Sequence, residues 1–226
     1  MLTLWVKSLN LLTRLKFANG ERMKKTVNVA VLVSGGGTNL QAIIDFTAAG
    51  NLESGKVVKV ISNKQDAYAL QRAQNAEIET AVVIKKGKTQ QEFEQGLIAE
   101  LEACNAEVIV LAGFMCILSK DFTDRYKDRI INVHPSLIPS FCGEGFYGLK
   151  VHEAALAKGV KVTGATVHFV NEIPDGGKII MQKAVKVKEK DTPETLQKRV
   201  MQEAEWKILP ASLELVCKNI LKGEIK

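Results

Sequence analysis

The residues best suited to chemistry lie in one short stretch, Asn-Val-His-Pro-Ser-Leu-Ile-Pro, at positions 132–139. It follows a short apolar run at 129–131, which is typical of the end of a buried strand. Because side chains alternate along a strand, Asn132 and His134 are expected on one side and Val133 on the other. Strand ends border ligand sites in open α/β sheets, so an amide and an imidazole would face a substrate there. The alternative is a plain turn before proline.

A second cluster, Ser-Gly-Gly-Gly-Thr-Asn at 34–39, stands between a β-branched run at 27–33 and an apolar segment at 40–44. A strand, a glycine-rich turn and a helix direct backbone N–H groups and the positive helix end toward an anion. Thr38 and Asn39 would add side-chain donors. The sequence has neither the GK[ST] of a P-loop nor a full GxGxxG, which favours a single phosphate over a dinucleotide. A tight turn without a ligand is the alternative.

Three more segments could complete such a site. Residues 113–118 follow a predicted strand and either belong to the core or wall a ligand slot. Residues 142–148 contain three glycines and two aromatic residues, which predicts a mobile loop or lid. Asp175 precedes two glycines and is either a turn residue or a carboxylate directed at the histidine. His152, in a predicted helix, is taken as a surface or packing residue.

Alternating strands and helices should position these groups. Strands are predicted at 27–33, 56–62, 80–84 and 107–112, with helices at 67–75 and 89–104 between them. Right-handed crossovers and a parallel sheet follow from this order. The later strands, 162–170 and 179–187, are close neighbours, so antiparallel pairing is expected in the C-terminal third. A last helical segment begins at Thr192, and Pro210 is expected to kink or divide it. We therefore predict a three-layer α/β fold, with a mostly parallel twisted sheet and helices on both faces.

Composition narrows the class of protein. The chain has 226 residues, 46% of them hydrophobic and 25% charged, which suits one globular domain. The net charge of +6 comes from scattered lysines, which favours anionic small molecules over nucleic acid. Four cysteines without CxxC spacing indicate reduced thiols in a cytoplasmic protein. No His or Cys spacing suggests a metal site, and no run reaches the ~20 apolar residues of a membrane span.

The first residues differ from the rest. Residues 1–24 combine a charge-broken apolar stretch with a polar turn, and they show no clear signal-peptide cleavage site. Met23, just before the first strong strand, could be the natural start. We predict an N-terminal extension, loosely ordered, over 1–24 and a single domain over 25–226.

Five motifs in this order, SGGGTNLQAI, LAGFMCILS, NVHPSLIPSF, TGATVHFV and DGGKII, resemble those of the phosphoribosylglycinamide formyltransferase family. The resemblance runs from about Val27 to the C-terminus. It implies a Rossmann-like formyltransferase fold and a role in purine biosynthesis. The reaction implied is transfer of a formyl group from the co-substrate 10-formyltetrahydrofolate to the amine of glycinamide ribonucleotide. The expected partners are small-molecule substrates, in a monomer or homodimer, with no metal, nucleic acid or membrane.

The resemblance also implies roles for individual residues. The catalytic trio is matched by Asn132, His134 and Asp175, with His168 in support. The loop for the substrate phosphate is matched by Gly37, Thr38 and Asn39. A helix segment that meets the ribonucleotide is matched by Gln202, Glu203, Ala204 and Glu205. The folate site is matched by Gln90, Met115, Cys116, Ile117, Leu118 and Asn132, and by the loop Asn171, Glu172, Ile173, Pro174 and Asp175.

Two positions depart from the pattern, and other functions are open. Cys116 and Gln90 stand where many relatives have arginine, so any arginine grip on the folate anions is altered. A 10-formyltetrahydrofolate hydrolase has a similar core but carries an N-terminal regulatory domain, and a methionyl-tRNA formyltransferase needs a C-terminal domain for tRNA. From a different class, the chain could be a phosphate- or nucleotide-binding module without catalysis.

Overall fold

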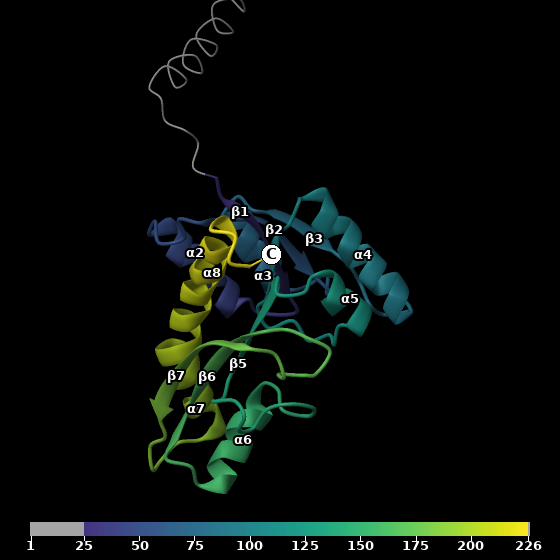
Figure 1. The fold of residues 1–226 in the computed structure, drawn as a ribbon. Coiled ribbons are helices and arrows are strands. Elements are labelled where there is room, and N and C mark those ends of the chain that lie inside the picture. The colour runs from purple at the N-terminus through teal and green to yellow at the C-terminus, as the bar shows by residue number, and fades with distance from the viewer. Residues whose placement is uncertain (1–24, 226) are drawn as a thin grey trace, which may run out of the picture.

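A seven-stranded sheet organises residues 25–225, the part of the chain that the computed structural model describes; the predicted extension at 1–24 lies outside it (Figure 1). The strands are β1 (Val27–Val33), β2 (Gly55–Ser62), β3 (Glu79–Val82), β4 (Val108–Leu111), β5 (Ile130–His134), β6 (Val162–Phe169) and β7 (Ile179–Lys186). The helices are α2 (Thr38–Ala48), α3 (Tyr68–Asn75), α4 (Gln90–Ala103), α5 (Lys120–Arg125), α6 (Leu149–Lys158), α7 (Pro193–Val200) and α8 (Trp206–Leu221), with a π-helical turn (Met201–Glu205) between the last two.

The strand order is β3-β2-β1-β4-β5-β6-β7. The first five strands in this order are parallel, and β6 and β7 each pair antiparallel with the strand before them. The predicted fold class is therefore confirmed, including the change to antiparallel pairing in the C-terminal third. Because β1 to β5 are parallel, their carboxyl ends meet at one edge of the sheet, which we call the rim.

Different helices cover the two faces of the sheet. On one face, Val29 and Val31 of β1 pack in a cluster with residues of α2, α3 and α8. On the other face, Leu32 packs in a cluster with Phe93 of α4 and Phe122 of α5. The central strand β1 is therefore buried on both sides, which explains its unbroken run of apolar and β-branched residues.

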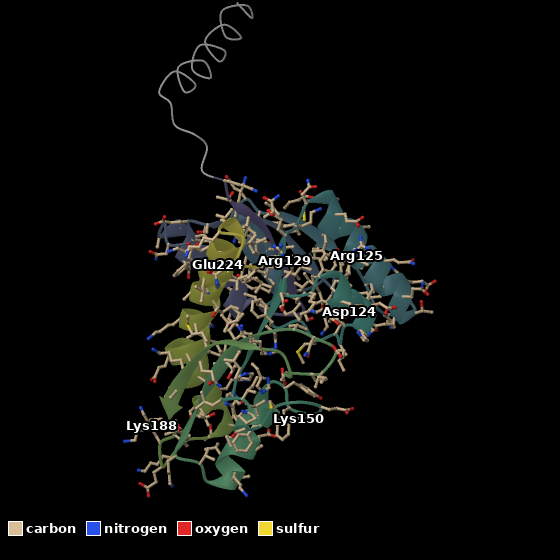
Figure 2. All side chains as sticks on the ribbon, viewed as in Figure 1. Asp124, Arg125, Arg129, Lys150, Lys188 and Glu224 are labelled. Carbon is tan, nitrogen blue, oxygen red and sulfur yellow. The ribbon has the colours of Figure 1, made fainter. Side chains whose placement is uncertain are left out.

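Charged side chains lie on the outside of this framework. Figure 2 shows them projecting from separate elements, among them Arg125 of α5, Lys150 of α6 and Lys188 after β7. Within residues 25–225, no helix combines the length and apolar character needed to cross a membrane.

The helix α5 was not predicted from the sequence. Its six residues are too few to show a helical period, although Ser119 caps it by accepting a hydrogen bond from the N–H of Phe122. The helix matters for the rim because the Ser119 hydroxyl also donates to the buried carboxylate of Glu94 at 2.5 Å, which ties the segment after β4 to α4.

Of the two expectations for Pro210, a kink or a division of the last helix, the division is wrong. Pro210 lies inside α8, and the irregularity is the π-helical turn one turn earlier. In an undistorted helix the ring of Pro210 would crowd the carbonyl of residue 206. The wider π-helical turn ends at Glu205, directly before residue 206, so the irregular backbone lies one turn before the proline.

His152 is a packing residue, not a surface one. It lies in α6, is fully buried, and neither ring nitrogen has a hydrogen-bond partner among the described residues. Burial, with a smaller effect from His134, lowers the pKa of His152 to about 4. The folded protein therefore keeps this ring neutral at pH values where an unfolded chain would protonate it.

Replacing His152 should make stability less sensitive to acid. The wild-type protein has full stability from this site above pH 6.5, the ordinary pKa, and loses it as the pH falls toward 4. Between pH 7 and pH 5, this site should lower the free energy of unfolding of the wild-type protein by about 2 kcal/mol. His152→Leu should not show this decrease. Urea unfolding at both pH values measures the difference. His152→Gln, which is polar but does not titrate, should behave like His152→Leu; a variant with the wild-type pH dependence would contradict the prediction.

Candidate active site

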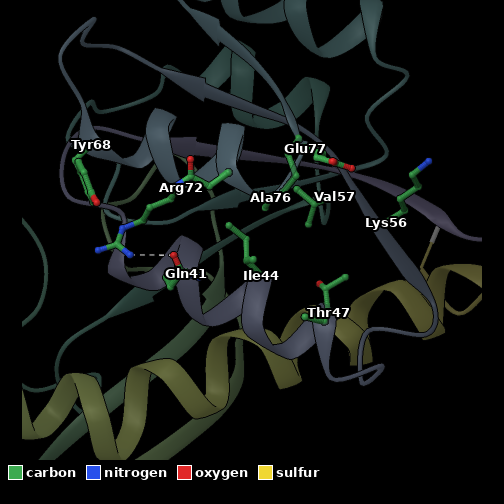
Figure 3. A pocket seen from close by; sticks show the side chains of 12 residues that line it. Gln41, Ile44, Thr47, Lys56, Val57, Tyr68, Arg72, Ala76 and Glu77 are labelled. Atoms are coloured by element: carbon green, nitrogen blue, oxygen red, sulfur yellow. Dashed lines mark hydrogen bonds between the residues drawn. The ribbon is translucent and has the colours of Figure 1, made fainter.

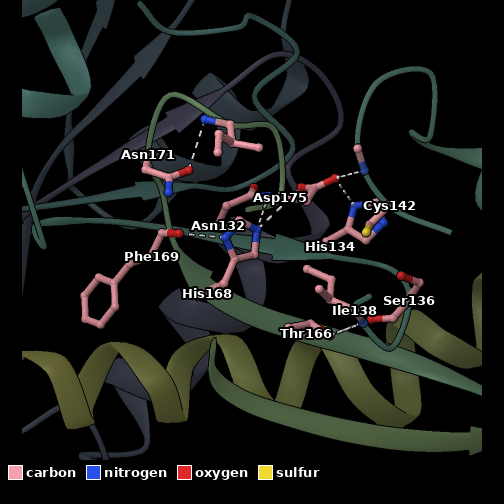
Figure 4. A network of polar contacts seen from close by, with 12 residues as sticks. Asn132, His134, Ser136, Ile138, Cys142, Thr166, His168, Phe169, Asn171 and Asp175 are labelled. Carbon is pink, nitrogen blue, oxygen red and sulfur yellow. Dashed lines mark hydrogen bonds and ion pairs between the residues drawn. The ribbon is translucent and has the colours of Figure 1, made fainter. Parts of the chain in front are cut away.

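The predicted catalytic residues meet at the carboxyl end of β5. Asn132 and His134 lie on the same side of this strand, opposite His168 and Thr166 of β6. The carboxylate of Asp175 lies between the two histidines: its Oδ2 is 3.3 Å from His134 Nδ1 and its Oδ1 is 3.5 Å from His168 Nε2 (Figure 4). The expected approach of the carboxylate to His134 is therefore confirmed.

Close backbone packing brings Asp175 to this position. A Cβ atom on Gly177 would lie 1.7 Å from the Phe169 carbonyl oxygen, so only glycine lets the loop return so near to β6. Asp175 itself adopts the left-handed backbone of this turn, with φ of 56°. The two glycines supply space, and the strained residue is the one that carries the carboxylate.

The segment after Pro139 closes over the same pair. His134 Nε2 lies 2.8 Å from the carbonyl oxygen of Phe141, and the N–H of Gly143 donates to Asp175 Oδ2 at 2.9 Å. His134 is 4% exposed. Each ring nitrogen of His134 thus faces an acceptor oxygen, an arrangement that suits a ring carrying protons on both nitrogens.

Burial and charge act in opposite directions here. Burial lowers the pKa of His134, and the Asp175 carboxylate and the Phe141 carbonyl offset part of that effect. For Asp175, burial would raise the pKa, but His168, His134 and the Gly143 N–H outweigh it, so the pKa of this carboxyl lies below its usual value. Asp175 is therefore a carboxylate at neutral pH, placed to hold a proton on His134.

The glycine-rich turn lies on the same rim, after β1. Gly37 is the N-cap of α2 with φ of 70°, and a Cβ atom there would lie 2.6 Å from Ala69 Cβ. The carbonyl of Gly35 accepts from the N–H of Ala69 at 3.0 Å, and that of Gly36 accepts from Arg72 Nε at 2.8 Å. These contacts hold the turn against α3. The N–H groups that begin α2 have no intrahelical partners because they lie in its first turn, so they are available to an anion.

Arg72 was not predicted as a site residue. Besides Gly36, it donates to Gln41 Oε1 at 2.9 Å, along one side of a groove of about 690 Å³ between α2 and α3 (Figure 3). The groove is lined by helix-face side chains such as Ile44 and Thr47 and holds none of the predicted trio. We therefore assign Arg72 to the support of the glycine-rich turn and place the reaction centre elsewhere.

The segment 113–118 forms the rim beside these groups. The N–H of Met115 donates to Ser34 Oγ at 2.8 Å, and Cys116 Sγ accepts from Asn63 Nδ2 at 3.0 Å. Gln90, in the first turn of α4, donates to the Ile117 carbonyl at 3.0 Å. Met115 and Ile117 remain 56% and 70% exposed, and Ile173 in the loop 171–175 is 59% exposed. From the sequence, this segment could be either core or a ligand wall. In the structure Leu118 is buried, Phe114 and Cys116 pack against the core, and Met115 and Ile117 form an exposed apolar wall.

The predicted set at 202–205 separates into two parts. Gln202 and Glu203 are exposed, whereas Ala204 and Glu205 are buried. Glu205 Oε2 accepts from Asn39 Nδ2 at 2.8 Å, so the π-helical turn contacts the glycine-rich turn through one carboxyl group. Burial raises the pKa of Glu205 to about 7, although the hydrogen bond from Asn39 lowers it in part.

Sequence reasoning missed the groups that hold the site together. The Phe141 carbonyl and the Gly143 N–H are backbone atoms, which no residue type identifies in advance. Among residues 25–225, no group of three or more His, Cys, Asp and Glu side chains is arranged to hold a metal ion.

Comparisons with known proteins point to one family. Residues 27–213 match the model of the formyl transferase family. The chain is 40% identical over 205 residues to a phosphoribosylglycinamide formyltransferase of Haemophilus influenzae, covering 90% of both chains. It is 46% identical over 200 residues to the human trifunctional purine biosynthetic protein adenosine-3, covering 88% of this chain and 19% of that protein. The chain thus spans about a fifth of the length of the trifunctional relatives it matches.

A solved structure agrees with these sequence matches. The glycinamide ribonucleotide transformylase 1 of Symbiobacterium toebii superimposes with a TM-score of 0.81 at 38% identity, covering 89% of this chain and 93% of that chain.

Replacing Glu205 by glutamine should stabilise the protein at high pH. Because the folded pKa of about 7 exceeds the ordinary 4.5, stability from this site is complete below pH 4.5 and is lost as the pH rises through 7. Glutamine keeps an acceptor for Asn39 and does not titrate. We expect the free energy of unfolding of Glu205→Gln, measured relative to wild type, to rise by about 3 kcal/mol from pH 4.5 to pH 8. Denaturant unfolding at the two pH values tests this, and an equal difference at both would refute it.

Proposed function

The chain belongs to the formyl transferase family and, within it, to the phosphoribosylglycinamide formyltransferases, and we propose that it formylates glycinamide ribonucleotide with 10-formyltetrahydrofolate as the donor. The observation that carries the proposal is the His134–Asp175 pair, at 3.3 Å, on the same rim as the glycine-rich turn 35–39 and the exposed apolar wall 115–117. One rim thus offers a proton-handling pair, an anion site and a surface for a flat apolar ring. We assign the activity to one domain over 25–226, as the unbroken sheet supports.

The chemistry of the reaction matches these groups. The amine nitrogen of the ribonucleotide attacks the formyl carbon, and a tetrahedral intermediate forms with a negative oxygen and a protonated amine. The amide of Asn132 and a protonated His134 donate hydrogen bonds to that oxygen. The C–N10 bond then breaks, and the proton lost by the amine ends on N10 of the folate.

Asp175 acts through His134 in this scheme. Its negative charge stabilises the protonated ring, against the burial that lowers the pKa of His134. In the described conformation the Phe141 carbonyl accepts the hydrogen bond of His134 Nε2. A formyl oxygen that takes the place of this carbonyl would keep the donor satisfied throughout the reaction.

The two substrates would bind at neighbouring parts of the rim, after β1 and after β4. The phosphate of the ribonucleotide would bind the N–H groups at Gly37, Thr38 and Asn39, where α2 begins. The pterin ring would pack on the segment 115–118, through the exposed side chains of Met115 and Ile117, and on the loop 171–175, next to Asn132. Cys116 makes a thiol contact with Asn63, so its backbone and not an arginine charge would serve the folate.

The transferase is tested by assaying formylation with both substrates and again without the amine acceptor. We expect formylglycinamide ribonucleotide only when glycinamide ribonucleotide is present. Release of formate at the same rate without the acceptor would instead indicate a hydrolase. No turnover under either condition would leave a binding module and overturn the proposal.

His134→Ala should slow turnover severely and keep substrate binding. The loss of the donor to the oxyanion is expected to lower kcat by about 10²–10³, because such donors act mainly in the transition state. Isothermal titration with glycinamide ribonucleotide checks that its affinity is retained. Lys150→Ala, on exposed α6 surface, is the control and should keep wild-type kcat. Unchanged turnover in His134→Ala would remove this residue from the mechanism.

Gly37→Ala should weaken ribonucleotide binding more than it slows the chemical step. Alanine at φ of 70° is strained, and its Cβ would meet Ala69, so the turn must move away from α3. We expect KM for the ribonucleotide to rise about tenfold or more with a smaller change in kcat and no change in KM for the folate. Gly50→Ala is the matched control, since it has φ of 76° and no atom within 4 Å of a Cβ. Equal effects of both variants would show that strain alone, and not the anion turn, is responsible.

A further inference from the structure

The sheet ends at β7 with an open edge. This strand is 8 residues long, and among the described residues no strand pairs with its outer side. In an antiparallel pair, every second residue directs its N–H and C=O groups away from the partner strand. The N–H of Val187 donates to the Lys161 carbonyl, so in this register Val185 faces β6 and Ala184 faces outward. The edge therefore presents backbone groups that could pair with a further strand.

A side-chain contact confirms which groups face outward. The carbonyl of Lys186, two residues after Ala184, accepts from Arg199 Nη1 at 3.1 Å. Arg199 is itself paired with Asp191, so this end of the edge is held by α7. The outward N–H groups of Gln182 and Ala184 have no such partner in the part of the chain that the structure describes.

Lysines that lie apart in the sequence gather around this edge. Two are on β7, two lie between the end of α6 and the start of β6, and two follow β7. All are exposed, and Figure 2 shows one of them, Lys188, projecting into solvent. Within residues 25–225 none of them forms an ion pair. The six are Lys158, Lys161, Lys183, Lys186, Lys188 and Lys190.

These charges determine which strand can bind. A second copy of β7 would bring lysines opposite lysines, and like charges on facing strands are destabilising. An acidic strand would place carboxylates beside the unpaired lysines. Val162, which is 52% exposed and is the cross-strand partner of Lys186, gives an apolar side chain of that strand a surface to pack on.

We propose that the β7 edge is a docking site for an extended acidic segment of a partner protein, which adds to the sheet as a further strand. The inference does not depend on the proposed function, because β6 separates this edge from Asn132 and His134 on β5. The alternative is that the lysines only protect an exposed edge from aggregation. That role needs no pairing of the outward backbone groups, so the two can be separated.

The first experiment uses a short synthetic peptide in which glutamate alternates with valine, titrated into the full chain and followed by NMR. We expect saturable binding and amide hydrogen exchange at Ala184 that slows by about tenfold or more. Exchange at Val185, which is already bonded to β6, should change little. Ala184→Pro removes the outward N–H at an edge position, where proline is tolerated, and should lower the affinity for the peptide by about tenfold or more. Ala184→Thr is the control and should bind like wild type; thermal unfolding checks that both variants are folded.

The second experiment reverses charges at the edge. The triple variant Lys161→Glu, Lys186→Glu and Lys188→Glu should bind the peptide about tenfold or more weakly, because attraction at three exposed sites becomes repulsion. The matched control has the same net charge, but its three exposed lysines lie on other elements, and it should keep wild-type affinity. It consists of Lys56→Glu, Lys88→Glu and Lys127→Glu.

Several results would overturn the proposal. The edge merely protects itself if the peptide does not bind, or if it binds without slowing exchange at Ala184. Equal weakening by both triple variants would show an attraction to net charge and not to this edge. Binding of duplex DNA or anionic vesicles, but not of the peptide, would assign the lysines to another class of partner. Exchange at Ala184 that slows with protein concentration alone would identify a second copy as the occupant.

Discussion

A carboxylate held between two histidines is the interaction on which the rest of the site depends. Asp175 comes from a loop far along the chain from His134, and it reaches that ring only because β6 turns back antiparallel beside β5. Taking a carboxylate out of water is costly unless partners replace the lost hydration. Two imidazoles and a backbone N–H do so here, and they hold the pKa of Asp175 below its usual value although burial raises it.

The rim is assembled from short contacts between segments that follow different strands. Ser34 after β1 holds the backbone of Met115 after β4, and Asn63 after β2 holds Cys116. Parallel strands make this possible, because their carboxyl ends lie side by side. The polar contacts fix the backbone and leave the apolar side chains of Met115 and Ile117 outward, so the wall is rigid in its main chain and open on its surface.

The sequence predicted those parts of the molecule that follow from residue type and period. Strand alternation correctly placed Asn132 and His134 on one side of β5, and the order of elements gave the parallel sheet and its antiparallel end. Prediction from the sequence failed where local backbone hydrogen bonding decides the structure. The π-helical turn at 201–205 arises from a shift of backbone bonding that no side-chain period records, and it is what turns Glu205 inward while Gln202 stays exposed. The left-handed backbone of Asp175 and the close approach of Gly177 to Phe169 are likewise features that residue type alone does not reveal.

The cover over His134 is built from main-chain atoms. A carbonyl at 141 and an N–H at 143 satisfy the imidazole and the carboxylate, and Gly143 supplies its N–H from a backbone with φ of 87°, a conformation that favours glycine. The cover therefore depends on backbone shape and not on side-chain chemistry, and a glycine at 143 is what that shape requires.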